Sequence, residues 1–572
     1  MITRDNCAID LIEITNTSGR NVVVDLSMQW GLLENGAATT SSWSFQCKGY
    51  DCYVRGSIRQ KKKTQKIVPG ETVSIAIFAA IDLSEEEATA ILDHWIKRQN
   101  ILEEHKKEFY SFFDGTPDFE SANPALQKMW AYRWYLLKRN MADPQCGRLK
   151  HPLFYEGRST KMVLTPWHPS VWEFSKLIPF GTPMHLLESR WHRQDDTCKG
   201  EILSLIENMT DDGLFQCVWV DHACDSYTDF VGWSVWQYYL VKRDRKWLAQ
   251  VAPAIMRQVE ATLAVFDEDH DFLPTVINHG STGKEYQPSF FFKAGYPKEP
   301  MDQYATPLER VDAACYLYMN AYASGLMMRE LGRTADSERM LKIAANVKAA
   351  ITEKMWDHKR HFFYDIDAVS HDRIPVENVV GVDPFLADIA GLENIRTYER
   401  LADVDQLGTP CPVASTTRKN LVYSPDASWM GKYIKGKNGC LWNGAVWPFT
   451  NSTVLMGMAN IIRRGAVSLI PLFENIFTKY TMMCFRNNDL KDPIIYEHYN
   501  AETGRPISVE EDYFHSTWLD LFISCVAGII PTKNGKPRIQ PVCNMGEFAL
   551  RDVFVAGYMV DVESDKKGVR QQ

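Results

Sequence analysis

The chain has 572 residues and carries 63 Lys and Arg against 72 Asp and Glu, a net charge of −9. This acidic balance argues against a nucleic-acid or anionic-membrane binder, because both kinds of protein concentrate positive charge on one surface. Hydrophobic residues make up 45% of the chain and charged residues 24%, which excludes disorder as the dominant state. The length predicts several domains, or one large toroid with an appendage.

Targeting and redox signals indicate a cytoplasmic location. The amino terminus lacks the basic and apolar regions of a signal peptide, and no stretch approaches the roughly 18 apolar residues of a membrane span. The 13 cysteines are odd in number, irregularly spaced and without a Cys-x-x-Cys pair. That pattern is typical of reduced core thiols rather than of disulfides or structural zinc. The basic run at residues 59–63 is interpreted as a solvated turn.

Residues 1–82 are predicted to form an N-terminal β domain. Segments 22–24, 53–58 and 72–78 are β-branched or alternating, and Gly, Asn and Pro separate them. Ser84 followed by Glu87 is typical of a capping box, so a helical stretch is expected to begin there. We interpret residues 83–122 as a helical linker.

From residue 123 onward, amphipathic helices dominate. Apolar residues at spacings of three and four mark one helix face from Val311 to Met328. Further helices are expected at 124–140, 183–192, 197–209, 231–242, 245–266, 335–356, 443–463, 465–483 and 513–527. An acidic turn followed by an aromatic extended piece recurs at 211–215, 267–273 and 357–363. Paired helices with recurring turns predict a ring of α-hairpins over residues 123–535, with a C-terminal extension at 536–572. A long solenoid is the alternative.

Nucleotide, hydride, zinc-protease and serine-hydrolase signatures are missing, since there is no Gly-x-Gly-x-x-Gly, His-Glu-x-x-His or Gly-x-Ser-x-Gly. Acidic and aromatic residues instead cluster in loops before the predicted helices, where a toroid would bring them to one mouth. These clusters lie at 154–158 with 167–168, 229–236, 301–304, 441–448, and 496–504 with 513–518. Two carboxylates among aromatic walls are what glycoside hydrolysis requires. A single Asp before a helix is more often an N-cap, so the prediction depends on the recurrence.

At this point the sequence resembles a known family. The segment at 442–448, Trp-Asn-Gly-Ala-Val-Trp-Pro, is similar to the Trp-x-Gly-x-Val-Trp-Pro segment of glycoside hydrolase family 63 and its trehalase-like relatives. The stretch from Glu497 to Gly504 resembles that family's Glu-x-Tyr-(Asn/Asp) motif, and Val311-Asp312 resembles its Val-Asp-Leu-Asn helix. The likeness covers about residues 125–530. It implies a mainly α protein, an (α/α)6 barrel with a small N-terminal β-sandwich-like domain, and an inverting hydrolase of α-linked sugars, most often glucose, with no metal or organic cofactor in catalysis.

The resemblance also assigns roles to residues. Glu497 matches the family's general base, and Tyr513, 16 positions later, matches an aromatic turn before Trp. The acid is expected at Asp302, although the Ser-Pro-Arg part of the family's Asp-Asn-Ser-Pro-Arg-like loop is absent around it. Other acid candidates are Asp229 and Glu309, and weaker base candidates are Glu502, Glu510 and Glu511. Sugar contacts are expected from Arg158, Trp167, Asp229, Trp233, Gln303, Trp442, Asn443, Trp447 and Tyr499.

Three alternatives stay open. The toroid could be another sugar enzyme, such as a rhamnosidase or arabinofuranosidase. It could be an epimerase, for which His222, His498 and His515 are candidates. It could also be a non-catalytic carbohydrate-binding toroid. In each case the expected partner is a small carbohydrate, not nucleic acid or membrane, and the oligomeric state is open. Residues 1–82 are shorter than the family's usual β-sandwich, so either a reduced domain or a chain that begins inside it is expected.

Overall fold

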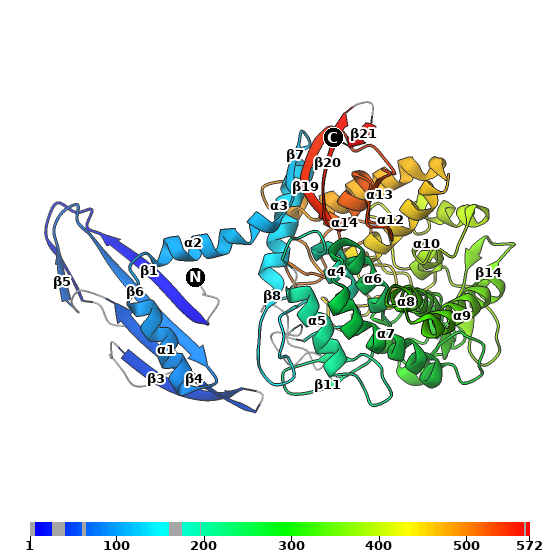
Figure 1. The fold of residues 1–572 in the computed structure, drawn as a ribbon, viewed down its shortest axis with the longest axis horizontal. Coiled ribbons are helices and arrows are strands. Elements are labelled where there is room, and N and C mark those ends of the chain that lie inside the picture. Colours follow the sequence, from blue (N-terminus) through cyan, green and yellow to red (C-terminus); the bar gives the residue numbers. More distant parts are fainter. Residues whose placement is uncertain are drawn as a thin grey trace. The chain divides into compact units, whose positions relative to one another are not determined.

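The computed structural model describes residues 6–25, 40–47, 49–59, 64–158, 174, 176–194, 196–565 and 568–571. Contacts divide the chain into two compact units, Met1–Asp114 and Gly115–Gln572 (Figure 1). The division lies inside the segment expected to be a helical linker. Within the described residues, every helix is too short or too polar to cross a bilayer.

The first unit is an antiparallel sheet with a helix against it. The strands expected between residues 7 and 82 are β1 (Cys7–Thr15), β2 (Val22–Asp25), β3 (Thr40–Cys47), β4 (Tyr50–Arg59), β5 (Thr64–Ile67) and β6 (Thr72–Asp82). They form a sheet in the order β1-β6-β4-β3 and a separate β2-β5 ribbon. Helix α1 (Glu85–Ile96) begins where predicted, because Ser84 Oγ accepts from the Glu87 amide. Its Leu92 and Trp95 pack on Phe78 of β6, and α2 (Ile101–Ser111) follows.

The second unit is mainly helical. Its longer helices are α3 (Pro124–Asn140), α4 (Thr182–Ser189), α5 (Asp196–Glu207), α6 (Val231–Lys242), α7 (Arg245–Phe266), α8 (Val311–Glu330), α9 (Thr334–Ala350), α12 (Pro448–Arg463) and α13 (Ile470–Met483). The short helices are α10 (Asp383–Leu386), α11 (Glu399–Ala402) and α14 (Leu519–Leu521). Contacts run from α4 to α6, α8, α10, α12 and α14 and then back to α4, which closes a ring. Helices α5, α7, α9, α13 and α3 pack against this ring or against one another.

Small sheets complete the second unit. β7 (Asp118–Ser121) pairs with β19 (Phe548–Val555), followed by β20 (Tyr558–Asp565) and β21 (Gly568–Gln571), so the predicted C-terminal extension joins the start of this unit. Strands β12 (Thr275–Val276), β13 (Leu308–Glu309) and β16 (Ile366–Asp367) form a three-stranded sheet. The remaining two-stranded pairs are β8 (Met141–Ala142) with β9 (Leu153–Phe154), β10 (Cys217–Val218) with β11 (Ala223–Cys224), β14 (Trp356–Asp357) with β15 (Phe362–Phe363), and β17 (Ile529–Ile530) with β18 (Arg538–Ile539).

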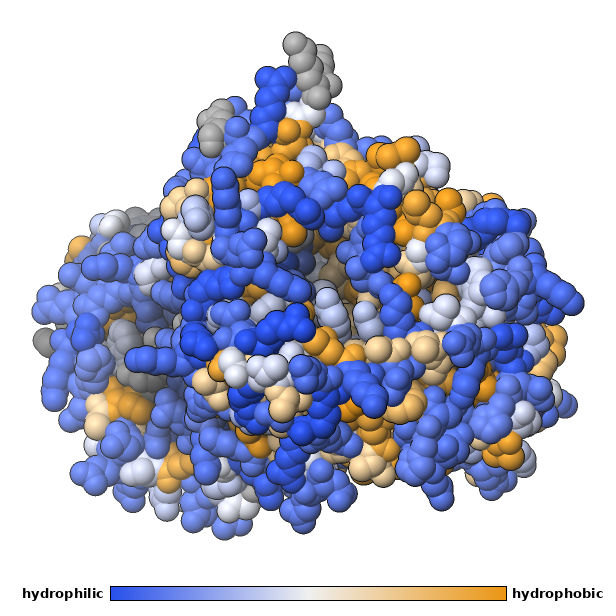
Figure 2. All heavy atoms as spheres, turned by 45° about the vertical axis from the view of Figure 1, so that its right-hand side comes forward, coloured by the Kyte–Doolittle hydropathy of each residue, from blue (hydrophilic) through white to orange (hydrophobic). Residues whose placement is uncertain are grey.

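Three predicted helices begin later than the sequence pattern suggests. Helix α12 begins at Pro448 rather than residue 443, α13 at Ile470 rather than residue 465, and the helix expected from residue 513 at Leu519. The backbone before α12 and before α14 is bound by other parts of the unit. Before α12, the Gly444 amide donates to Ser415 Oγ and the Val446 amide to the Tyr499 carbonyl. Before α14, the Phe514 amide donates to the Glu156 carbonyl and the Thr517 amide to Ser452 Oγ. The turned face in Figure 2 is mostly hydrophilic, with hydrophobic side chains in small groups.

Candidate active site

A cavity of about 1010 Å³, including the part open to solvent, lies in the second unit. The described residues that line it come from the segments before α4, α6, α8, α12 and α14, so loops that precede helices of the ring do converge on one hollow. Its acidic lining residues are Glu156, Glu285 and Glu497. Lys176, Lys435 and Lys437 line the same cavity, so anionic and cationic groups face one space.

Glu497 is one of the predicted residues that reaches this cavity. Its side chain is 12% exposed, and its Oε2 accepts from Ser508 Oγ at 3.1 Å and lies 3.5 Å from His498 Nδ1. Burial acts to raise the pKa of Glu497, but hydrogen bonding and charge from His498, together with His515 and Ser508, bring it below its ordinary value. The carboxyl is therefore ionised at neutral pH, which is the state that a general base requires.

Aromatic rings stack beside Glu497. Trp442 and Trp447 lie with their ring centroids 3.8 Å apart and an interplanar angle of 10°, and both line the cavity. Trp447 stacks in turn on His498 at 4.9 Å. Both indoles are 1% exposed and Trp447 lies between Trp442 and His498, so the stack forms an apolar wall of the cavity. The two tryptophans reach the cavity from the loop before α12, in the segment that resembles the family motif.

Asn443 lies next to these rings but does not face the cavity. It is fully buried, and its amide nitrogen donates to the carbonyls of Val422 at 2.8 Å and Ser428 at 2.7 Å. Gly444 follows with a φ of 150°, and a Cβ there would collide with the Ser424 carbonyl. We expected Asn443 to bind a sugar hydroxyl; the structure shows that it holds the loop that carries the two tryptophans.

Glu285 also lines the cavity, and sequence reasoning missed it. Cys440 Sγ donates to its Oε2 at 3.2 Å, and its backbone carbonyl accepts from the Trp442 amide at 2.9 Å. Burial acts to lower the pKa of Lys435, but Glu285, together with Cys440, Tyr286 and Glu497, outweighs it. The net pKa is raised, so the ammonium stays charged beside the Glu285 carboxyl group. One signal could have found it: Pro288 follows Glu285 by three positions, as Pro follows the acid in the family's Asp-Asn-Ser-Pro-Arg-like loop.

Glu156 is the third carboxyl of the cavity. It is 3% exposed, and Tyr513 Oη donates to its Oε2. Burial raises the pKa of Glu156 to about 7, and the nearby negative charge of Glu497 adds to this rise, while Tyr513 and His185 oppose it. Gly181 packs so closely that a Cβ there would overlap Glu156 Oε1. Glu156 is therefore poised to titrate near neutral pH next to the ionised Glu497.

A buried ionic cluster anchors the segment that carries Glu285. Lys284 is 1% exposed, and its Nζ donates to Asp312 Oδ2 at 2.7 Å and to Tyr316 Oη at 3.0 Å. Arg310 donates to both oxygens of Asp312 at 2.9 Å. Burial acts to raise the pKa of Asp312, but Arg310 and Lys284 hold it far below its ordinary value. The first turn of α8 is thereby tied to the residue that precedes Glu285.

Asp302 lies elsewhere. Its side chain is 80% exposed in a short turn at Asp302–Tyr304, its Oδ1 is 3.1 Å from His279 Nε2, and it is not among the described residues that line the cavity. Gln303 is exposed in the same turn. The pairing of Asp302 with Glu497 across the hollow, on which the predicted mechanism depended, is therefore not what the structure brings together. The segment between β12 and β13 is long and irregular, so residue spacing could not fix which of its acids faces inward.

Most of the other predicted binding residues have structural partners outside the cavity. Asp229 is buried before α6, accepting from the Val231 amide at 2.9 Å and from Gln258 at 2.6 Å, and burial raises its pKa to about 7. Arg158 donates to two backbone carbonyls. The Trp233 ring lies edge-on to Phe230 with the centroids 6.0 Å apart, and Tyr499 Oη accepts from the Tyr496 amide. Trp167 lies outside the described residues.

The remaining candidates divide between the cavity and other places. Glu309 is on β13, away from this cavity, and Glu502, Glu510 and Glu511 are not among the described residues that line it. Of the histidines, His515 lines the cavity, and burial lowers its pKa to about 3. His498 is buried under Trp447, and His222 is half exposed and stacks on Trp219.

Comparisons with known proteins agree on the fold and the family. The family model described as "Mannosylglycerate hydrolase MGH1-like glycoside hydrolase domain" matches residues 176–516. A solved family 63 mannosylglycerate hydrolase from Thermus thermophilus, in complex with glucose, is 14% identical with a TM-score of 0.51, over 69% of this chain and 98% of that chain. This supports an α/α toroid and confirms the resemblance found in the sequence.

Longer structures also match. A structure described as a sialidase is 16% identical with a TM-score of 0.66, covering 99% of this chain and 57% of that one. A family 78 rhamnosidase from Bacillus sp. GL1 is 12% identical with a TM-score of 0.54, over 98% of this chain and 49% of that chain. An uncharacterised protein of Borreliella burgdorferi is 26% identical over 198 residues, which are 34% of this chain and 37% of that protein. The chain thus spans about half of the two longer structures, and the likeness to them shows the fold alone.

Proposed function

Because the chain belongs to the mannosylglycerate hydrolase MGH1-like glycoside hydrolase family, we propose that it hydrolyses, with inversion, an α-glycosidic bond between a sugar and a small carboxylate-bearing aglycone. The observation that carries the proposal is the cavity in which Glu285, Glu497 and the stacked Trp442 and Trp447 meet. All four lie inside the matched region. The two enzyme carboxyls and the aromatic faces are the parts that acid–base cleavage of a glycoside needs.

Glu497 is proposed as the general base. Its lowered pKa keeps it ionised, so it can remove a proton from the water that attacks the anomeric carbon. Glu285 is proposed as the acid, in place of Asp302: in its protonated form it would give its proton to the departing oxygen. An inverting enzyme needs roughly 6.5 to 9.5 Å between the two carboxyls, because the water must fit between the base and the sugar.

Lysines in the cavity support an anionic aglycone. Lys435 stays charged beside Glu285, where the leaving group would depart, and Lys176 and Lys437 line the same hollow. A carboxylate such as that of glycerate, which forms part of the name of the Thermus relative, would pair with these ammonium groups. The sugar itself is proposed as an α-linked hexose, with glucose and mannose as the first to test.

Leaving-group dependence tests the assignment. α-Glucosyl- and α-mannosylglycerate require a protonated leaving oxygen, whereas the corresponding α-glycosyl fluorides do not. We expect Glu285→Gln to lose about 10²-fold or more on the glycerates and to retain most activity on the fluoride. Glu497→Gln should lose both activities. For the wild-type enzyme, NMR should show that the anomer released first has the inverted configuration.

Asp302→Asn is the matched control. It removes an acidic group from the same segment between β12 and β13 but outside the cavity, so it should keep near-wild-type turnover on both substrates. If Asp302→Asn lost activity on the glycosylglycerates while Glu285→Gln kept it, Asp302 rather than Glu285 would be the general acid. Retained activity in Glu497→Gln, or release of a retained anomer, would contradict the mechanism.

Three broader proposals accompany this function. The closed helix ring is proposed to be the (α/α)6 barrel of the family, which would cover residues 123–535. Residues 536–572 are proposed to form a C-terminal extension. Residues 1–82, within the first unit, are proposed to form a small β-sandwich-like domain. A cytoplasmic location is proposed from the odd number and irregular spacing of the cysteines.

A further inference from the structure

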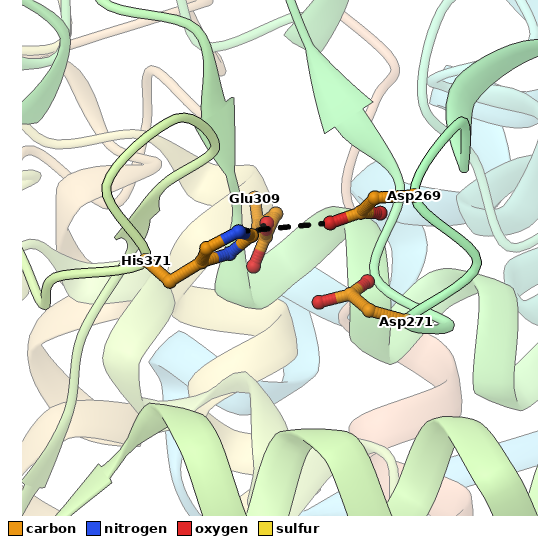
Figure 3. Close-up of side chains that lie close together, drawn as sticks. All are labelled: Asp269, Asp271, Glu309 and His371. Carbon is orange, nitrogen blue, oxygen red and sulfur yellow. Dashed lines mark ion pairs between the residues drawn. The ribbon is translucent and has the colours of Figure 1, made fainter.

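A second group of titratable side chains lies outside the cavity. Asp269, Asp271, Glu309 and His371 each offer one possible ligand atom, and these atoms all lie within 4.8 Å of one another. Figure 3 shows the four side chains converging from separate segments. We propose that this cluster binds a divalent metal cation that holds the three-stranded sheet β12-β13-β16 together.

The fold places the cluster at one sheet. Glu309 is the second residue of β13, the middle strand. Asp269 and Asp271 lie in the turn between α7 and β12, on one side, and His371 lies in the loop after β16, on the other. One ion would thus join three chain segments far apart in sequence.

The acidic turn is fixed before any ion binds. Asp267 Oδ1 accepts from the amides of Asp271 at 2.9 Å and Phe272 at 3.2 Å. This turn is one of the recurring acidic turns of the sequence. The Asp267 carboxylate thus holds the turn in place by accepting from its amides. The side chains of Asp269 and Asp271 point toward Glu309 (Figure 3).

Glu309 is the independent observation that points to a ligand. Its side chain is 1% exposed, and neither carboxyl oxygen has a hydrogen-bond partner among the described residues. His371 Nδ1 approaches Oε1 only to 3.4 Å. A buried carboxylate without donors is costly, and a cation at the centre of the cluster supplies the missing partner.

The spacing fits an ion with oxygen ligands. Ca²⁺–oxygen distances of about 2.3–2.6 Å place opposite ligands about 4.6–5.2 Å apart, close to the span of the cluster. Mn²⁺ also prefers carboxylates, and His371 offers it an imidazole nitrogen. Both cations would bind the three carboxylates. Mn²⁺ would also use the imidazole nitrogen of His371, whereas Ca²⁺ prefers oxygen ligands and would depend less on it.

Nearby basic side chains do not fill this role. Lys354 Nζ pairs with Asp271 Oδ2 at 2.5 Å, which neutralises one carboxylate and leaves Glu309 without a hydrogen-bond donor among the described residues. Arg373 donates to the backbone carbonyls of Lys354 and Glu353 instead. The cluster therefore keeps more carboxylates than Lys354 can balance.

The test is direct metal binding by the full chain. After treatment with EDTA and dialysis, the protein is titrated with CaCl₂ and MnCl₂ by calorimetry, and its Tm is measured with and without each ion. We expect one ion per chain and a rise in Tm, because an ion that binds only the folded state stabilises it. Glu309→Gln and Asp269→Asn should each weaken binding at least about tenfold and remove most of the rise.

Asp372→Asn is the matched control, because Asp372 lines the second hollow, into which Asp269, Asp271 and His371 also open, but it is not one of the four ligand candidates. It should bind as the wild type does. A Ca²⁺ preference that survives His371→Ala, or an Mn²⁺ preference that His371→Ala removes, supports the site and identifies its ligand set. No stoichiometric binding of either ion, or binding unchanged in Asp269→Asn and Glu309→Gln, would overturn the proposal.

Discussion

Replacing Glu156 by glutamine should change how the stability of this protein depends on pH. Burial raises the pKa of the folded-state carboxyl from 4.5 to about 7. Each tenfold change in acidity corresponds to about 1.4 kcal/mol, so ionising Glu156 in the folded protein costs roughly 3 kcal/mol relative to the unfolded chain. Glutamine keeps the size of the side chain and an oxygen that accepts from Tyr513, but it cannot ionise.

The sign follows from which state holds the proton more tightly. Because the folded pKa lies above the unfolded one, the stabilising contribution of Glu156 is complete below about pH 4.5 and is lost as the pH rises through 7. The free energy of unfolding of the wild type, minus that of Glu156→Gln, should therefore fall by roughly 3 kcal/mol between pH 4.5 and pH 8. Groups that titrate alike in both proteins cancel in this difference.

Urea unfolding followed by tryptophan fluorescence at several pH values measures the difference. The matched control is Glu338→Gln on α9, where the side chain is exposed and the same substitution should give a difference independent of pH. Parallel stability profiles for the wild type and Glu156→Gln would refute the reasoning, since they would mean that Glu156 is not destabilised when charged. Glu497→Gln should also lower the pKa of Glu156, because the Glu497 charge contributes to its rise.

Three further substitutions test the architecture of the site. Asp312→Asn should destabilise the protein by about 3–5 kcal/mol in urea unfolding, because it leaves buried cations partly uncompensated; a loss under about 1 kcal/mol would contradict this role. Asn443→Ala should cost about 2–4 kcal/mol by leaving two buried carbonyls without donors, and sugar-binding affinity that falls while stability stays unchanged would instead favour direct contact. Trp447→Ala should cost about 3–5 kcal/mol and raise KM, and an unchanged KM would exclude the ring from the sugar site.

Local sequence patterns predicted the elements that local interactions decide. Helices at 231–242 and 245–266 have the predicted bounds, since a continuous apolar stripe and a capping Asp244 fix the second of them without help from distant residues. The β segment before residue 82 and the cap at Ser84 followed from the same kind of signal. The motifs at 442–448 and 497–504 identified the family and two of the segments that line the cavity, because their spacing is short and dense in unusual residues.

Only the tertiary structure decided which side chains meet. Glu285 and Asp302 lie in one irregular segment between β12 and β13. Which of them reaches the cavity depends on how Lys284 anchors to Asp312, a contact between residues far apart in sequence. Asn443 carries the same amide whether it binds a sugar or a carbonyl, so its role depends on the backbone that packs around it. Helical periodicity likewise could not reveal that residues 513–518 give up helical hydrogen bonds for partners such as Glu188, because those partners come from other helices of the ring.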